Sequence, residues 1–307
     1  MNQKLLPLMV LTVHTSVLDL WKKLTQMVTG QDTMTKRSNI NLLSNRILSV
    51  QASLNGLSFC ILDTIENNIL LLKDIHFEEQ KNPLEIEKLL VAEFETTSLL
   101  QQEFKQVNLI HQNNICTFVP NIFYDENNLV DYLKFNNKIF ESDFIATDEI
   151  VSKEIMSVYV PFVNINNFFF ERFGSFEYHH ASTIIVEQLL KVATPTTNKL
   201  YCNVSYTSFE LISIKNGVLN FFNSFDFDTK EDFVYYVLFT IEQLQLDAEI
   251  IDLILLGDIG LDDELYSILY QYIRNISFGS RNTQFMARDI EQKPKYGYNH
   301  FSLLNTF

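Results

Sequence analysis

Cysteine is scarce in this sequence, and its spacing argues against two common kinds of site. Cys60, Cys116 and Cys202 are the only three among 307 residues, and no two of them form a Cys-x-x-Cys pair. A zinc site built on such pairs is therefore not indicated. The count is odd and each cysteine lies in a largely apolar stretch, so we predict buried, reduced thiols.

Positive charge is also in short supply. The chain has 38 acidic and 23 basic residues, a formal net charge of −15, and its adjacent basic residues, such as Lys22-Lys23 and Lys36-Arg37, are isolated pairs. A phosphate backbone is repelled by such a field, so no nucleic acid is expected as a partner. The same argument disfavours an anionic membrane surface.

No apolar run approaches the roughly 20 residues that a membrane-spanning helix needs. The nearest candidate, Leu5 to Val13, is soon interrupted by polar residues, and no small-residue cleavage site follows it. We therefore predict no transmembrane segment and a cytoplasmic protein. Residues 1–40 are interpreted as a disordered or mis-annotated extension, and the true start, Met1 or Met34, is left open.

The short motifs of several enzyme classes are missing. Gly-x-Ser-x-Gly, His-Glu-x-x-His and the Walker A pattern do not occur. The adjacent pair His179-His180 has no carboxylate or cysteine after it at metal-ligand spacing, so no metal site is predicted. Neighbours on a strand point opposite ways, and we expect one of these rings in the core and one in solvent.

What the chain does have is a pattern of strands and turns. Ile47 to Leu62 predicts a hairpin that turns at Leu54-Asn55-Gly56, because Asn-Gly between β-rich arms favours a tight turn. A third strand is expected at Ile69 to Leu72, and Pro83 opens a helix expected to reach about Lys105. Further strands are predicted at 107–111, 115–119, 144–150, 154–160 and 175–179, and helices at 164–173 and from Ser182 to about Val192.

The last third of the chain follows the same order. Three strands are predicted at 199–203, 209–214 and 218–227, with a turn at Lys215-Asn216-Gly217. A helix follows from Thr229 to Leu246, then a buried strand at 251–256, then a helix capped by Asp262 and reaching about Arg274.

The two meanders align at a constant offset. Val50 to Leu62 matches Cys202 to Ile214 strand for strand, so that Ser53 meets Ser205 and Phe59 meets Leu211. This pattern predicts an internal repeat. Two unrelated meanders are the alternative.

A meander, a helix, a strand and a helix, occurring twice in one chain, resemble the actin-like ATPase superfamily, whose halves have a ribonuclease-H-like fold. Within it the chain is similar to PilM-type pilus-assembly proteins and, above all, to the bacterial domain-of-unknown-function family 3822. The resemblance implies an α/β fold of two halves, 41–195 and 196–307, each a mixed five-stranded-type sheet with flanking helices. Another α/β binding domain is the alternative.

Active members that the chain resembles carry Asp-x-Gly and small hydroxyl residues in the first hairpin of each half. Matching that pattern places Gln51-Ala52-Ser53 at the first site and Asn203-Val204-Ser205 at the second. Amides therefore replace both carboxylates, and Ser53 and Ser205 replace both glycines. An amide carries no charge to compensate Mg²⁺, and serine adds a Cβ where a phosphate must approach. The family mechanism of ATP hydrolysis is not expected here.

Two remnants of a nucleotide pocket remain in the matched pattern. Asn55-Gly56 is a loop that an anion could use, although a plain hairpin turn explains it better. Gly257-Asp258 lies where the superfamily has a Gly-Gly adenosine loop, with Asp258 at the second glycine. The resemblance thus implies a degenerate nucleotide pocket. Its members are Gln51, Ser53, Asn55, Gly56, Asn203, Ser205, Gly257 and Asp258.

Two functions follow from these residues. The first is a non-catalytic protein with a degenerate actin-like fold that binds a protein or peptide or serves as a scaffold; PilM-like relatives hold an extended peptide. The second is a nucleotide-dependent ATPase or kinase in which Asp226 or Asp258 holds the metal. The first needs no cofactor and the second needs ATP and magnesium. The identity of a partner and the oligomeric state are left open.

Overall fold

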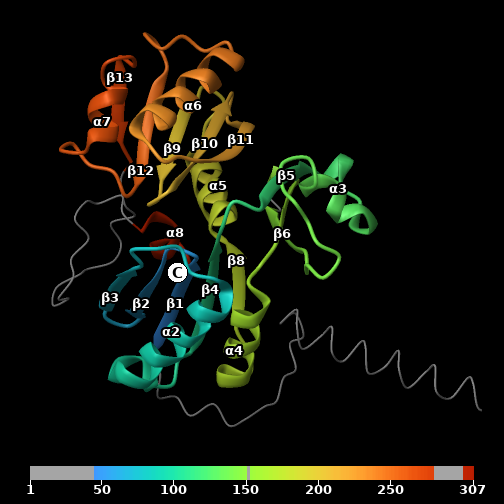
Figure 1. The fold of residues 1–307 in the computed structure, drawn as a ribbon, viewed down its shortest axis with the longest axis vertical. Coiled ribbons are helices and arrows are strands. Elements are labelled where there is room, and N and C mark those ends of the chain that lie inside the picture. The colour runs from blue at the N-terminus through green and yellow to red at the C-terminus, as the bar shows by residue number, and fades with distance from the viewer. Residues whose placement is uncertain (1–44, 151–152, 280–299) are drawn as a thin grey trace, which may run out of the picture.

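The computed structural model describes residues 45–150, 153–279 and 300–307. It contains two five-stranded sheets, one above the other in Figure 1, and a three-stranded sheet that projects to one side. We call the parts built on these sheets the first lobe, the second lobe and the small lobe. The predictions for residues 1–40 and for the start codon lie outside the described residues.

The first lobe has the strand order β3-β2-β1-β4-β8. The apolar residues of its strands are buried at alternating or consecutive positions, as expected for a sheet covered on both faces. The strands are β1 (Arg46–Ser53), β2 (Gly56–Asp63), β3 (Asn68–His76), β4 (Gln106–Gln112) and β8 (Glu177–His180).

Two of the helices that follow the first meander begin at side-chain caps. Asn82 and Glu85 form a capping box at the start of α2 (Pro83–Thr96), which ends earlier than predicted because a 3-10 turn, η1 (Ser98–Gln101), follows it. Helix α4 (Val163–Phe173) agrees with its prediction. His180, rather than the predicted Ser182, caps α5 (Ala181–Val192) by accepting a bond from the Ser182 amide.

The second lobe repeats this architecture with the order β11-β10-β9-β12-β13. A capping box of Thr229 and Asp232 starts its first helix, and Asp263, not the predicted Asp262, caps the second. That second helix ends at Leu269, short of the predicted Arg274. The elements are β9 (Asn198–Val204), β10 (Ser208–Lys215), β11 (Val218–Asp226), α6 (Lys230–Gln243), β12 (Asp252–Gly257), α7 (Glu264–Leu269) and β13 (Asn275–Phe278).

Register confirms the internal repeat. Gln51 pairs with Ser58 across the first hairpin, and Asn203 pairs with Glu210 across the second, which is the offset that the sequence alignment used. Each meander also carries an irregularity at the matched place, Ile61/Leu62 in one and Ser213/Ile214 in the other. Two unrelated meanders would not share register and bulge, so the halves are structurally related.

The small lobe interrupts the first half between β4 and β8. Its sheet has the order β5-β7-β6, and Leu133 of α3 packs on it beside Val119 and Val158. Its elements are β5 (Cys116–Pro120), η2 (Asn121–Phe123), η3 (Glu126–Asn128), α3 (Leu129–Leu133), β6 (Ala146–Ile150) and β7 (Ile155–Tyr159).

Two segments cross between the lobes. Helix α5 leaves the first sheet at β8 and buries Ile185 and Leu189 against the second sheet. At the other end of the chain, α8 (Phe301–Leu304) returns to the first lobe, where Leu303 and Leu304 are buried beside β2 and β4. The described C-terminal residues thus pack on the first lobe, while the division at 195/196 stays a prediction.

All three cysteines are free and buried, as predicted. In the described ranges no helix combines the length and the apolar character needed to cross a bilayer.

Candidate functional site

A cavity of about 300 Å³ lies between the first and second lobes. This volume is at the lower end of the range for small-molecule pockets. The eight residues predicted for a degenerate nucleotide pocket all line this cavity, so the structure brings them together. They are Gln51, Ser53, Asn55, Gly56, Asn203, Ser205, Gly257 and Asp258.

Amide and hydroxyl groups connect the lobes across this cavity. The Gln51 side-chain amide donates to Gln112 Oε1 over 2.6 Å, and the Gln112 amide donates to Ser205 Oγ over 2.6 Å. At the rim, the Asn55 amide donates to Thr207 Oγ1 over 2.7 Å. The first-site glutamine is therefore part of a neutral hydrogen-bond chain that ends on the second hairpin.

The C-terminal segment supplies a second partner for Gln51. The Ser302 hydroxyl donates to Gln51 Oε1 over 2.6 Å, so both ends of that amide are used. Next to it, His300 Nε2 lies 3.0 Å from Asp74 Oδ2. Burial acts to raise the pKa of Asp74, but the hydrogen bond and charge of His300 outweigh it and lower that pKa.

At the second site, Asn203 is held by a carboxylate. Its amide donates to Glu210 Oε2 over 3.0 Å, and the Ser182 hydroxyl at the start of α5 donates to the other oxygen. Burial raises the pKa of Glu210 despite these two bonds. Glu210 was not among the residues predicted from the sequence, although a lone carboxylate in the apolar stretch Ser208 to Ile214 was a signal for it.

Gly257 ends β12 in a conformation that favours glycine. Its φ is +79°, and a Cβ there would lie 2.1 Å from the carbonyl oxygen of Val204 on β9. The tight turn lets the Asp258 amide donate to that same carbonyl over 2.8 Å. A strand-to-strand contact thus explains Gly257 without a ligand.

The Asn55-Gly56 turn also differs from the predicted form. Gly56 is the first residue of β2 and pairs with Ser53, so the loop is Leu54-Asn55. Asn55 donates to Thr207 on the facing hairpin, which gives it a structural role between the lobes.

Acidic side chains outnumber histidines in the cavity lining. Asp74, Glu210, Asp226 and Asp258 line it, and its described lining contains no lysine or arginine. Because His300 pairs with Asp74 and burial favours the protonated form of Glu210, Asp226 and Asp258 are the carboxylates that would repel the phosphates of a nucleotide. Across residues 45–150, 153–279 and 300–307, no group of three or more His, Cys, Asp or Glu side chains is arranged to hold a metal ion.

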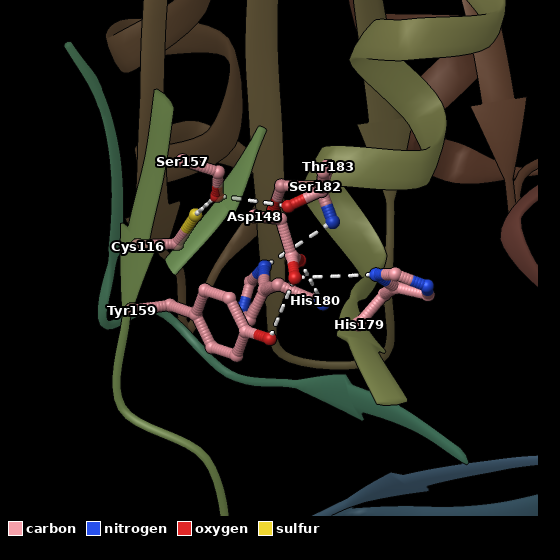
Figure 2. A network of polar contacts seen from close by, with 8 residues as sticks. All are labelled: Cys116, Asp148, Ser157, Tyr159, His179, His180, Ser182 and Thr183. Atoms are coloured by element: carbon pink, nitrogen blue, oxygen red, sulfur yellow. Dashed lines mark hydrogen bonds and ion pairs between the residues drawn. The ribbon is translucent and has the colours of Figure 1, made fainter. Parts of the chain in front are cut away.

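Behind the cavity, a buried polar network surrounds the start of α5 (Figure 2). Asp148 Oδ1 accepts bonds from Tyr159 and from His179 Nδ1, each 3.2 Å long, and its Oδ2 accepts the His180 amide over 3.2 Å. As predicted, His180 is fully buried and the His179 side chain is 44% exposed. Asp148 therefore ties β6 to β8 and to the start of α5.

The pKa values of the histidines in this region shift in different directions. Burial lowers the pKa of His180 to about 3 and that of His111, on β4, to about 4. Burial opposes protonation of His179 as well, but its hydrogen bond to Asp148 raises its pKa overall. A neutral ring fits His111, whose Nε2 lies 2.8 Å from Asn166 Oδ1 while its Nδ1 accepts the Phe162 amide over 3.2 Å.

The same network contains Cys116. Cys116 Sγ lies 3.5 Å from Ser157 Oγ, which accepts the Thr183 hydroxyl over 2.8 Å. Burial raises the pKa of the Cys116 thiol, so it stays protonated and is a poor nucleophile. The network in Figure 2 thus has a structural role, because it connects the sheet of the small lobe with that of the first lobe.

Sequence comparison decides the family. Residues 35–276 match the model of a family described as protein of unknown function, DUF3822, and this range is more than half of the chain. The chain belongs to the DUF3822 family. No curated protein matches it in sequence.

Solved structures show the fold of this DUF3822 protein. A protein of unknown function with an actin-like ATPase fold, from Bacteroides thetaiotaomicron, is similar with a TM-score of 0.65 and 20% identity, over 77% of this chain and 91% of that one. The two related lobes and this similarity establish the actin-like ATPase fold.

Two further solved structures are similar at lower TM-scores. A chain of the PilM-PilN type IV pilus biogenesis complex has a TM-score of 0.47 and 9% identity, over 79% of this chain and 90% of that one. The ethanolamine utilization protein EutJ from Carboxydothermus hydrogenoformans has a TM-score of 0.45 and 6% identity, over 85% and 93%.

Proposed function

We propose that this DUF3822 protein is a pseudo-ATPase: an actin-like protein that binds another protein or serves as a scaffold and does not hydrolyse nucleotide. The observation that carries the proposal is the state of Gln51. This amide stands where active relatives are expected to have a carboxylate, and both of its ends are bonded, to Gln112 and to Ser302. Both polar atoms of this side chain are thus engaged in bonds within the protein, and an amide carries no charge to compensate a metal ion and cannot act as a base towards water.

Electrostatics support the same function. A magnesium nucleotide needs positive groups around its phosphates, and the described lining of the cavity has no lysine or arginine to supply them. The hydrogen bonds from Gln51 to Gln112 and from Gln112 to Ser205 also connect the two lobes without a ligand. These bonds hold the lobes in one arrangement, and the fixed surface of the two lobes can then bind a protein partner. Three buried, reduced cysteines support the further proposal of a cytoplasmic location.

Isothermal titration of the full chain with ATP and Mg²⁺, up to millimolar nucleotide, tests the proposal. We expect no binding heat beyond dilution and no release of inorganic phosphate over hours. Saturable heat that needs both ATP and Mg²⁺ would overturn it.

A working ATPase or kinase with an altered metal site is the second candidate, because Asp226 and Asp258 both line the cavity. The Asp226 carboxylate already accepts a bond from the Asn114 amide, which places it on the small-lobe side. The variants Asp226→Asn and Asp258→Asn separate the candidates. If ATP binding occurs and either variant abolishes it, the second candidate is correct.

A further inference from the structure

Large apolar side chains are exposed together on the small lobe. Five of them fall within residues 122–140, on α3 and the segments that flank it, and Figure 1 shows this part at the edge of the molecule, away from both large sheets. We call them the small-lobe patch. Its members and their exposed fractions are Ile122 (85%), Phe123 (71%), Val130 (47%), Phe135 (83%) and Phe140 (57%).

The patch rests on a fixed frame. The Tyr132 hydroxyl of α3 donates to the Phe123 carbonyl over 2.7 Å and accepts the Asp125 amide over 2.8 Å. The rings of Tyr124 and Tyr132 stack, and Leu133 anchors α3 in the small-lobe core. A surface that is already ordered loses little conformational entropy when a partner binds.

Packing covers these side chains only in part. Lys134 Nζ lies 5.7 Å from the centroid of the Phe135 ring and Lys138 Nζ lies 4.9 Å from that of Phe140, yet both rings are more than half exposed. On α3, Leu133 is 1% exposed, whereas Val130, three residues before it, is 47% exposed. Exposed apolar residues that occur singly are ordinary, but several on one short segment mark an interaction surface.

The charge around the patch selects the kind of partner. Residues 121–143 contain five Asp and Glu and two Lys, and one of these lysines, Lys134, already pairs with Asp131 over 2.7 Å. Basic groups on a partner would be attracted to the remaining carboxylates. A second copy of the chain, with its net charge of −15, and an anionic membrane are both repelled.

We infer that the small-lobe patch binds an amphipathic protein segment with one apolar face and basic residues beside it. Aromatic residues such as Phe123 and Phe135 are suited to be the anchors, because large rings contribute strongly to binding. This inference rests on the proposed function, since it gives the binding surface of a non-catalytic protein.

The test uses a fluorescent 14-residue model peptide of Leu and Lys at helical spacing, and a matched peptide with Glu in place of Lys. Fluorescence anisotropy of the full chain at physiological salt measures binding. The double variant Phe123→Ser/Phe135→Ser should weaken binding of the Leu/Lys peptide by at least about tenfold. The Leu/Glu peptide should bind neither chain.

A matched double variant, Ile250→Ser/Leu261→Ser, controls for loss of exposed apolar surface elsewhere, since these two residues are 72% and 62% exposed on the second lobe. It should leave binding unchanged, and both double variants should melt like the parent chain because all four sites are at the surface. Equal weakening by the two double variants, or equal binding of the two peptides, would overturn the inference.

Two further outcomes would assign the patch to another occupant and so overturn it. One is a dimer in sedimentation experiments that Phe123→Ser/Phe135→Ser dissociates. The other is binding to phosphatidylcholine vesicles that the same variant abolishes. The ATP titration is independent: failure of the peptide test leaves the absence of ATPase activity standing, and ATP binding would refute the proposed function whatever the peptide does.

Discussion

Replacing Gly257 by alanine tests how the cavity edge is built. The new methyl group would be placed 2.1 Å from the Val204 carbonyl oxygen and 3.0 Å from Asn203 Oδ1, on a backbone with a φ of +79°. Neither the carbonyl nor the backbone of β9 can move freely, because β9 is paired on both sides, with β10 and β12. The substitution must therefore strain the turn at the end of β12 and push β12 away from β9.

Two contributions set the size of the effect. A left-handed conformation costs a non-glycine residue about 1–2 kcal/mol. Overpacking that shifts backbone costs about 1–3 kcal/mol. We therefore expect Gly257→Ala to lower the free energy of unfolding by roughly 3 kcal/mol. Gly174 provides the matched control, since its φ is +73° but nothing lies within 4 Å of its added Cβ, so Gly174→Ala should cost only about 1 kcal/mol.

Urea unfolding followed by circular dichroism measures the loss of stability in each of the two variants. Hydrogen exchange measures the protection of the Asp258 amide, which donates to the Val204 carbonyl over 2.8 Å. That amide should exchange faster in Gly257→Ala and normally in Gly174→Ala. Equal losses of stability in the two variants would refute the reasoning, because the contact with Val204 would then have no energetic weight.

Three other predictions concern buried or paired groups. Burial lowers the pKa of His111 to about 4, so below pH 6.5 this ring binds a proton in the unfolded chain but not in the folded one. The free energy of unfolding should therefore fall as the pH drops towards 4. In urea unfolding at several pH values, His111→Gln should reduce that fall by on the order of 3 kcal/mol. Asp148→Asn should lower the pKa of His179 in an NMR titration, because the hydrogen bond to Asp148 raises it in the parent chain. The stability that this pair contributes is present below about pH 6.5 and is lost as the pH rises through the raised pKa. An unchanged pKa of His179 in the variant would contradict the role of Asp148. Cys60, Cys116 and Cys202 should not react with a thiol reagent in the folded chain and should give three equivalents after unfolding, so rapid modification of the native protein would argue against their burial.

The residues that line the cavity could be predicted from the sequence because the internal repeat is visible in short patterns of strands and turns. A strand–turn–strand unit fixes which residues face each other, so the offset between the meanders correctly paired Gln51-Ser58 with Asn203-Glu210. Glu210 and Gln112 were missed because neither belongs to the aligned Asp-x-Gly pattern, and their partners come from α5 and the second hairpin. Helix ends were predicted less well than strands, since a cap depends on one local bond, such as that to His180 or Asp263.

By itself, the sequence determined the two meanders and their repeat. These depend on alternation, turn residues and residue identity, which act over a few positions. The actin-like fold was predicted from the resemblance to that superfamily, and the same resemblance led to the prediction that Gln51 and Asn203 stand at the positions of its carboxylates. Only the tertiary structure decided that Gln51 is bonded to residues 61 and 251 positions away, that Asp226 and Asp258 line one cavity, and that five apolar side chains of the small lobe are exposed. Partners so distant along the chain are brought together by packing of whole lobes, which no local pattern specifies.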